Sequence, residues 1–340
     1  MASGQPDHFE QIHQWAEAGD VVSIGMLAHE FTLRERGEEC STEISFARER
    51  LATIPGLDAI AQVLSLLESA EPAEVRFLAA ALARHQNAGD LVAGLFGRAT
   101  VPSHTHELKA CLLHELVLEG VRVEGFSEIL EFGDLLARQD HPLGDLPLRR
   151  LPVEVLFKKP VYLSDAPSGE RIYQQPSFSG CTLVKLHDPS AEESIKKLLG
   201  ETAAETFGKI SADIFKASRF VGRENISGAI KGLSLPYVRR SQGDPFLISP
   251  EVALRLLFAL AASQQYGAYG RLSVWESIRG FVGAAPGRGI CDLAEMVESS
   301  QWYQCIPKSS WSCDEGKALV LIAVRPDGHT IAALGATRRA

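Results

Sequence analysis

Near its end the chain reads Ala318-Leu-Val-Leu-Ile-Ala-Val324, then Arg325-Pro-Asp-Gly328, then His329-Thr-Ile-Ala-Ala-Leu334. Two apolar runs on either side of a Pro-Asp-Gly turn predict a β-hairpin. The first run hardly alternates between apolar and polar residues, so neither of its faces is suited to water. We therefore expect this strand to lie inside a sheet, with both faces covered.

Other strands are predicted upstream of this hairpin. Residues 182–186 read as a short strand, and residues 161–163 and 171–173 flank a turn-rich segment and read as a second hairpin. Short strands with turns between them predict that the second half of the chain contains a sheet.

Helices are predicted between these strands. The segment Asp188-Pro-Ser190 follows a strand, and Ser190 and Glu193 have the spacing of a capping box. We expect the helical region to continue from Glu201 to Phe220, with a buried stripe of Phe207, Ile210, Ile214 and Phe215. A further helix begins at Ser249-Pro250-Glu251, because serine caps a helix and proline fits its first turn.

The first half of the chain is predicted to be helical. Phe9, Ile12 and Trp15 have helical spacing, and Gly-Asp recurs at residues 19–20, 89–90 and 133–134, each time before an apolar pair. Glycine ends helices and aspartate caps the next one. Two interpretations stay open: a degenerate stack of antiparallel helix pairs of the HEAT type, or ordinary helix junctions.

A domain boundary is predicted between the two halves. Residues 141–160 contain four prolines and a glycine, which exclude one long helix there. We expect an all-helical domain over residues 1–145 and an α+β domain over residues 146–340 that contains the terminal hairpin. The predicted fold class is α+β and predominantly helical.

Charge is distributed unevenly between these halves. Residues 1–150 contain 24 acids and 12 bases, which leaves 19 acids and 22 bases of the totals of 43 and 34 for residues 151–340. An acidic helical surface suits a basic protein partner, although acids also simply solvate the outer faces of helices. The net charge of −9 argues against general nucleic-acid binding.

Composition predicts a cytoplasmic protein. No run of eighteen apolar residues is present, so we expect no membrane-spanning segment. Residues 1–10 are polar and acidic and lack the basic start and apolar run of a secretory signal. The six cysteines are sparse and irregular, which favours reduced thiols over a disulfide framework.

Candidate metal ligands are densest between Ser103 and Glu115. His104 and His106 lie at the start of a predicted helix, and Glu107, Cys111 and His114 lie on one side of it. The spacing matches neither a zinc finger nor the His-Glu-x-x-His helix of zinc proteases. Leucines on the same helix are expected to pack in the core. We therefore predict no metal site and no cofactor, and we predict that Cys111 is a buried structural residue.

The most distinctive string is Tyr266-Gly-Ala-Tyr-Gly-Arg-Leu-Ser-Val-Trp-Glu-Ser-Ile-Arg-Gly280. Glycines permit close approach to the backbone, and aromatic rings beside arginine suit a flat or anionic ligand. The alternative is a turn followed by an amphipathic helix with Leu272, Trp275 and Ile278 in the core. The candidate ligand-binding residues are Tyr266, Tyr269, Arg271, Trp275, Glu276 and Arg279.

Two segments carry a resemblance to a known family. Tyr-Gly-Ala-Tyr-Gly-Arg-Leu-x-x-Trp at residues 266–275 and Val-Arg-Pro-Asp-Gly-His-Thr-Ile-Ala-Ala-Leu-Gly-Ala-Thr at residues 324–337 resemble an uncharacterised, largely actinobacterial family. The resemblance covers about residues 260–337. Members of that family end in an acidic Thr-Asp run, whereas this chain ends in Arg338-Arg339-Ala340. The resemblance implies a bacterial origin and a mixed fold, and it implies neither a mechanism nor catalytic residues.

Two functional hypotheses follow from these patterns. The first is a cytoplasmic, non-enzymatic interaction or regulatory protein that binds a partner through helical-repeat surfaces of its acidic half. The second is an enzyme or small-ligand-binding protein with its site around Tyr266–Arg279. The sequence identifies no substrate, no partner and no oligomeric state.

Overall fold

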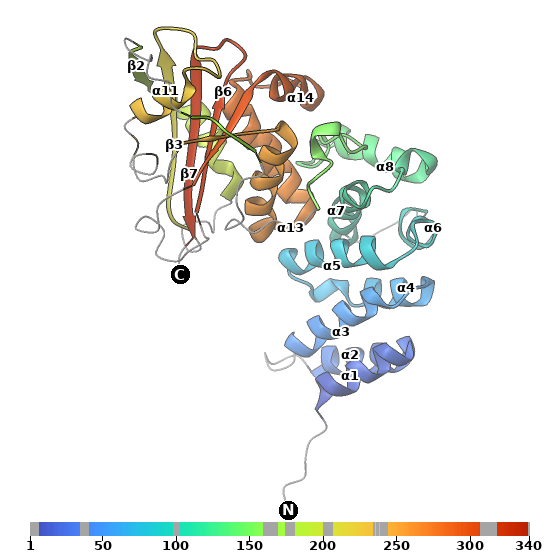
Figure 1. The fold of residues 1–340 in the computed structure, drawn as a ribbon. Helices are drawn as coiled ribbons and strands as arrows, with labels where there is room; N and C mark the ends of the chain where they lie inside the picture. The colour runs from blue at the N-terminus through green and yellow to red at the C-terminus, as the bar shows by residue number, and fades with distance from the viewer. Residues whose placement is uncertain are drawn as a thin grey trace, which may run out of the picture. The chain divides into compact units, whose positions relative to one another are not determined.

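The computed structural model describes residues 7–34, 41–97, 103–158, 169–173, 181–199, 207–233, 235, 238, 244–306 and 318–338. The chain divides into two compact units. Unit 1 comprises Met1–Arg149 and Tyr266–Ala268, and unit 2 comprises Arg150–Gln265 and Tyr269–Ala340. The described residues form a predominantly helical α+β fold, as predicted (Figure 1).

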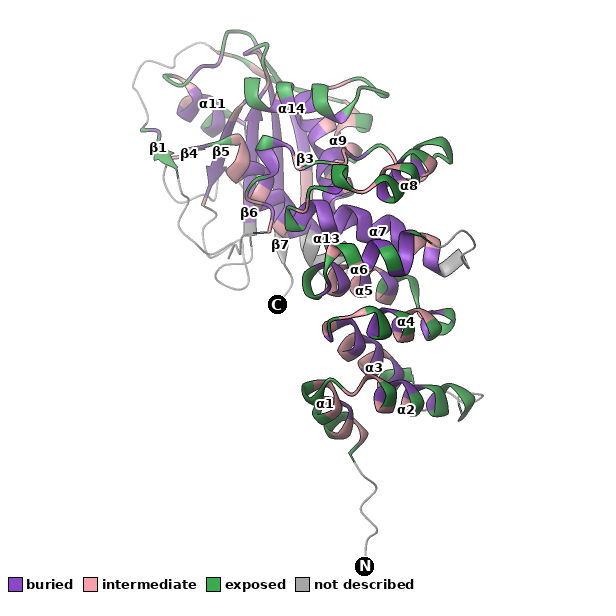
Figure 2. Cartoon of the chain, turned by 90° about the vertical axis from the view of Figure 1, so that its right-hand side faces the viewer, coloured by how far each residue is buried: buried purple, intermediate pink, exposed green. Residues whose placement is uncertain are grey.

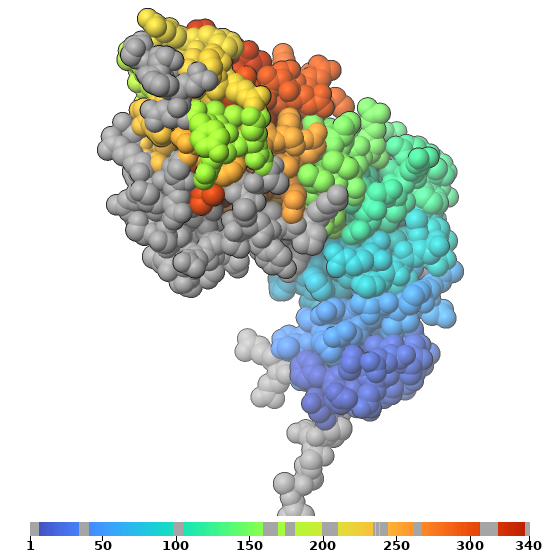
Figure 3. All heavy atoms as spheres, in the orientation of Figure 1, coloured from blue at the N-terminus to red at the C-terminus, as the bar shows by residue number. Residues whose placement is uncertain are grey.

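Helices account for the regular structure of unit 1. In chain order they are α1 (His8–Ala18), α2 (Val21–Arg34), α3 (Ser41–Thr53), α4 (Leu57–Ser65), η2 (Leu67–Ser69), α5 (Pro72–His85), α6 (Ala88–Leu91), η3 (Val92–Phe96), α7 (Ser103–Glu119), η4 (Val123–Gly125) and α8 (Ser127–Arg138). The space-filling view shows them as successive layers from blue α1 to green α8 (Figure 3).

Contacts between these helices arrange them in two rows. The helices α1, α3, α5 and α7 contact one another in that order. The helices α2, α4, the continuous segment α6–η3, and α8 do the same, and we call this second set the even row. Helices that are consecutive in the chain therefore alternate between two parallel stacks.

The Gly-Asp pairs have only partly the role that the sequence predicted. Gly19 ends α1 in the left-handed conformation (φ 69°), and Asp20 accepts a hydrogen bond from the Ser23 amide, so this pair is a helix junction. The pairs at residues 89–90 and 133–134 instead lie inside α6 and α8, and that part of the prediction is wrong. Asn87 caps α6 in place of Asp90, because its side chain accepts the Gly89 amide.

Unit 2 contains a seven-stranded antiparallel sheet in the order β1-β4-β5-β6-β7-β3-β2. The predicted terminal hairpin is confirmed: β6 pairs with β7 from Ala318↔Thr337 to Val324↔Ile331. The strand β6 lies between β5 and β7, as its apolar sequence predicted. The strands are β1 (Glu170–Arg171), β2 (Leu183–Leu186), β3 (Phe207–Ala217), β4 (Phe246–Ile248), β5 (Gln301–Cys305), β6 (Ala318–Val324) and β7 (Thr330–Arg338).

Helices cover both faces of this sheet. On one face, α11 (Ile226–Gly232) packs with Tyr303, Ile322 and Ala333 in a continuous apolar core. On the other face, Trp302 of β5 lies against Phe281 of α13 (Pro250–Val282) and donates its indole N–H to Val297 of α14 (Ile290–Ser299). Figure 2 shows that the strands between these helices are mostly buried.

Two predictions for unit 2 are corrected by the structure. Residues 207–217, predicted as part of a helical region, form β3, so Ile214 and Phe215 point to opposite faces of a sheet. Pairing along most of β7 and with β2 outweighs the local helical pattern. The helix α9 (Pro189–Lys196) is capped by Asp188, which accepts the Ala191 amide, and not by Ser190.

Other predictions are met in part. Ser249 caps α13 as expected, but no turn interrupts this helix before Gly280. Residues 183–186 form β2 as expected. Residues 161–163 of the second predicted hairpin lie outside the described residues, and Arg171 pairs with β4. Among the described helices, none has the length and apolar composition needed to cross a membrane.

Candidate functional site

The six residues predicted as a ligand site all lie on α13. Arg271 and Trp275, one turn apart, are buried and converge on the carboxylate of Glu154, which lies in the short helix η5 (Pro152–Glu154). Glu154 Oε1 accepts from Arg271 Nε and Trp275 Nε1, each at 2.7 Å. Glu154 Oε2 accepts from Arg271 Nη2 at 2.9 Å and from the Leu151 amide at 2.8 Å.

These hydrogen bonds to Glu154 give Arg271 and Trp275 a structural role in the protein interior. Neither the Arg271 nor the Glu154 side chain has exposed surface. A buried carboxylate that accepts hydrogen bonds from four donors has satisfied both of its oxygens. Sequence reasoning did not identify Glu154, because it lies 117 residues before Arg271 in a proline-rich segment that resembles a linker.

The other predicted residues do not join this cluster in the described contacts. Glu276 lies 3.3 Å from Lys197, and its carbonyl accepts the Ser194 hydroxyl, so it joins α13 to α9. Arg279 donates to the Ala285 carbonyl after the end of α13. Tyr269 is half-buried, and the side chain of Tyr266 lies outside the described part of the chain.

The predicted metal-ligand helix is α7, and part of its cluster assembles. Glu107 is the centre: it lies 3.5 Å from Cys111 Sγ, 3.3 Å from His141 Nε2 and 3.7 Å from Arg76 Nε. The Leu143 amide donates to His141 Nδ1 at 3.2 Å, and His141 Nε2 faces Glu107 Oε2. Both nitrogens of His141 are thus engaged in holding the loop after α8.

This cluster has the properties of a structural contact. Burial raises the pKa of the Cys111 thiol well above its usual value, and the neighbouring Glu107 carboxylate raises it further, so no thiolate forms at neutral pH. Within the described residues, no group of three His, Cys, Asp or Glu side chains is placed to hold a metal ion. The side chain of His104 lies outside that part of the chain.

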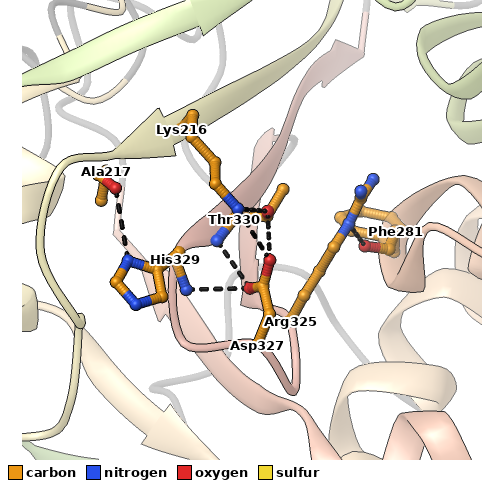
Figure 4. Close-up of polar contacts among 7 residues, drawn as sticks. All are labelled: Lys216, Ala217, Phe281, Arg325, Asp327, His329 and Thr330. Atoms are coloured by element: carbon orange, nitrogen blue, oxygen red, sulfur yellow. Dashed lines mark hydrogen bonds and ion pairs between the residues drawn. The ribbon is translucent and has the colours of Figure 1, made fainter.

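The turn between β6 and β7 contains another dense polar cluster (Figure 4). Asp327 Oδ1 accepts the amides of His329 and Thr330, both at 2.8 Å, and Oδ2 accepts from Thr330 Oγ1 at 2.7 Å and Lys216 Nζ at 3.0 Å. Partial burial raises the pKa of Asp327, but these hydrogen bonds outweigh it and lower the pKa well below its usual range. The carboxylate therefore stays charged and fixes the turn.

A buried carboxylate also lies on the sheet. Asp213 of β3 is almost fully buried and contacts Lys185 of β2 and the hydroxyl of Ser211. The hydrogen bond to Asp213 raises the pKa of Lys185. This cation bridges two neighbouring strands, which gives the contact a role in pairing β2 with β3.

An exposed apolar stripe lies on α2 of unit 1. Val22, Met26 and Leu33 are exposed by 65%, 70% and 70%, and we call them the α2 stripe. The opposite side of the same helix supplies buried residues to unit 1, among them Ile24, Ala28 and Phe31. Exposed apolar side chains in a row along a helix are typical of a docking surface for another protein.

Acidic residues outnumber basic residues along the even row as a whole. The helices α2, α4, α6, η3 and α8 contain six acids and two bases, and each base is the last residue of its helix. The acids are Glu30, Asp58, Asp90, Glu128, Glu131 and Asp134, and the bases are Arg34 and Arg138. The α2 stripe and the even row together form the candidate interaction surface.

Comparison with known proteins places the chain in a family. No curated protein and no solved structure matches it. Residues 7–339 match the sequence model of DUF6183, described as a family of unknown function. The prediction of an uncharacterised family, which rested on residues 260–337, is confirmed, and the match extends over nearly the whole chain. The chain therefore belongs to DUF6183, a family of unknown function.

Proposed function

We propose that this chain is a bacterial, cytoplasmic, non-enzymatic interaction or regulatory protein that binds a protein partner through a helical repeat in unit 1. The α2 stripe carries the proposal. Three large apolar side chains are exposed on a helix whose other side is fully packed. Covering such side chains with a partner removes apolar surface from water, which is the main driving force of protein association.

The arrangement of unit 1 supports a repeat of helix pairs. Each row contains every second helix, and each helix packs on the next one in its row, which is the contact pattern of α-solenoids. Solenoids present extended surfaces made by one row of helices. The even row, with its acids and the α2 stripe, is the surface of unit 1 that we assign to the partner.

Purification of the tagged full-length protein from its native cells, with cross-linking and mass spectrometry, tests this function. We expect one protein to co-purify reproducibly, with its cross-links on unit 1, and to be lost from the variant Met26→Asp/Leu33→Asp. The exposed pair in this variant keeps the fold intact, which circular dichroism checks. The absence of a reproducible partner, or cross-links confined to unit 2, would reject the proposal.

A small-ligand site around Tyr266–Arg279 is the second candidate. Tyr269, Glu276 and Arg279 favour it, because they are only partly buried. In such a site, the hydrogen bond from Arg279 to the Ala285 carbonyl would hold the Arg279 guanidinium beside the ligand. A thermal-shift screen of anionic and aromatic metabolites tests it: a hit must lose its shift in Arg279→Met, and a screen without such a hit rejects the site.

A further inference from the structure

The strand β2 lies at one end of the seven-stranded sheet and pairs with β3 on its inner side. The Ser218 amide donates to the Thr182 carbonyl, and the Thr182 amide donates to the Ser218 hydroxyl, so Thr182 faces β3. Because bonding alternates along an antiparallel strand, the backbone groups of Leu183 and Lys185 point outward. In the part of the chain that the structure describes, no strand lies beside this outer edge. Such an edge is a template for pairing with another chain.

The sequence of β2 suits this pairing except at one position. The strand reads Leu183-Val-Lys-Leu186, and Val184 is 57% exposed. Apolar and β-branched residues without charge are typical of segments that add to other sheets. Lys185 is the single charged residue of this strand. A lysine within a short edge strand is one of the devices by which proteins prevent such pairing.

Asp213 of β3 keeps the Lys185 ammonium group at this edge. Lys185 Nζ contacts Asp213 Oδ1, and the same carboxylate accepts the hydroxyl of Ser211. The hydrogen bond to Asp213 raises the pKa of Lys185, so the amine stays charged at neutral pH. The Asp213 side chain is 5% exposed, whereas that of Lys185 is 55% exposed. The buried carboxylate therefore holds in place a cation that still faces water.

A second copy of this chain is the partner that this cation opposes most directly. Two copies present identical β2 edges, which can pair antiparallel about a twofold axis. This pairing would bring two Lys185 side chains together on the same face of the joined sheet, and like charges on neighbouring strands are destabilising. It would also remove water from both ammonium groups, which costs free energy.

We infer that Lys185, held by Asp213, prevents the β2 edge from pairing with the β2 edge of a second copy of this chain. The contact between Lys185 and Asp213 thus has a role beyond joining β2 to β3. This inference concerns unit 2 and is independent of the function proposed for unit 1.

Analytical ultracentrifugation of the full-length chain tests the inference. Lys185→Val/Asp213→Val removes both charges together, so neither is left without its partner. At equal concentration, we expect this variant to have about twice the mass of the wild type or more, because an apolar edge is then open.

Two matched variants separate the edge from apolar surface in general. Lys197→Val replaces a lysine that is 52% exposed and paired with Glu276, but that lies in the short helix η6 (Lys197–Leu199). It should leave the mass unchanged. Lys185→Pro/Asp213→Val also removes both charges, but proline has no N–H to donate from the outer edge, so this variant should not associate.

Circular dichroism shows which variants are folded. If valine at both positions unfolds the protein, Lys185→Thr replaces that variant, because it leaves Asp213 and its bond to Ser211 in place, and it is likewise expected to associate. A folded variant with an uncharged, non-proline residue at position 185 that keeps the mass of the wild type would overturn the inference. An equal increase in Lys197→Val, or association that persists in the proline variant, would also overturn it. A wild-type dimer that dissociates in the proline variant would show that this edge is an interface.

Discussion

Arg271 and Glu154 form a completely buried ion pair with two hydrogen bonds, from Nε to Oε1 at 2.7 Å and from Nη2 to Oε2 at 2.9 Å. This pair joins the middle of α13 to the segment that follows the helices of unit 1 in the chain. Trp275 donates to the same carboxylate, so one glutamate aligns two side chains of one helix face. The pair positions α13 and leaves neither group free to meet a ligand.

Removing one member of this pair is expected to destabilise the protein strongly. Arg271→Met or Glu154→Leu leaves the other charge buried and uncompensated, at a cost of about 3–5 kcal/mol. The double variant buries no charge, so its loss should be smaller than the sum of the two single losses. Urea unfolding of the three variants, followed by circular dichroism, measures this coupling, and additive losses would contradict it.

Gln86 is expected to be critical for the turn between α3 and α4. Its Oε1 accepts the Gly56 amide at 2.9 Å, and its Nε2 donates to the carbonyls of Ala52 and Ile54 at 3.0 and 2.6 Å. Gln86→Leu leaves these backbone groups without their partner and should cost about 2–3 kcal/mol in urea unfolding. The exposed Gln14→Leu is the control, and an equal loss in both variants would refute this role.

Local patterns in the sequence predicted those elements whose stability is local. The Pro-Asp-Gly turn between two apolar runs identified β6 and β7, and Ser249 before Pro250 identified the start of α13. The strand β3 was misread, because its residues also fit a helical stripe. Its conformation is determined by β7, more than a hundred residues later in the chain, and a local pattern contains no information on such a partner.

The candidate sites show the same difference between local and distant information. The string from Tyr266 to Arg279 was singled out for its composition, but the role of Arg271 depends on Glu154, which is remote in sequence. The acidity of the first half was visible at once. That Val22, Met26 and Leu33 are the exposed side of α2 was not, because a helix with apolar residues on both sides gives no indication of which side is packed.

The cysteines are expected to differ sharply in reactivity. Burial raises the pKa of Cys305 to about 12 and also raises the pKa of Cys111, whereas Cys291 is exposed. Because the thiolate is the reactive form, iodoacetamide at pH 8 should alkylate Cys291 in the folded protein, and Cys111 and Cys305 only after unfolding. Peptide mass spectrometry reads out each site, and labelling of Cys305 as fast as Cys291 would contradict the buried position of β5.

Asp327 is expected to make stability depend on pH in the acid range. Its folded pKa lies below the unfolded value of 3.8, so the carboxylate stabilises the protein above about pH 4, and this contribution is lost as the pH falls towards the folded pKa. Asp327→Asn removes the contribution. The gap in unfolding free energy between the wild type and Asp327→Asn should therefore be constant near neutral pH and narrow below about pH 4.

Solvent limits the difference in unfolding free energy between the wild type and Asp327→Asn. The Asp327 side chain is 45% exposed, so water screens its charge. Thr330→Val provides the matched control: it removes the hydroxyl that donates to Asp327 and keeps the shape of the side chain. The pH-dependent loss of unfolding free energy should be smaller in Thr330→Val than in Asp327→Asn, since the two backbone amides and Lys216 still hold the carboxylate. Urea unfolding at intervals between pH 7 and pH 3 gives the three curves, and a gap that stays constant down to pH 3 would show that the turn does not depend on this charge.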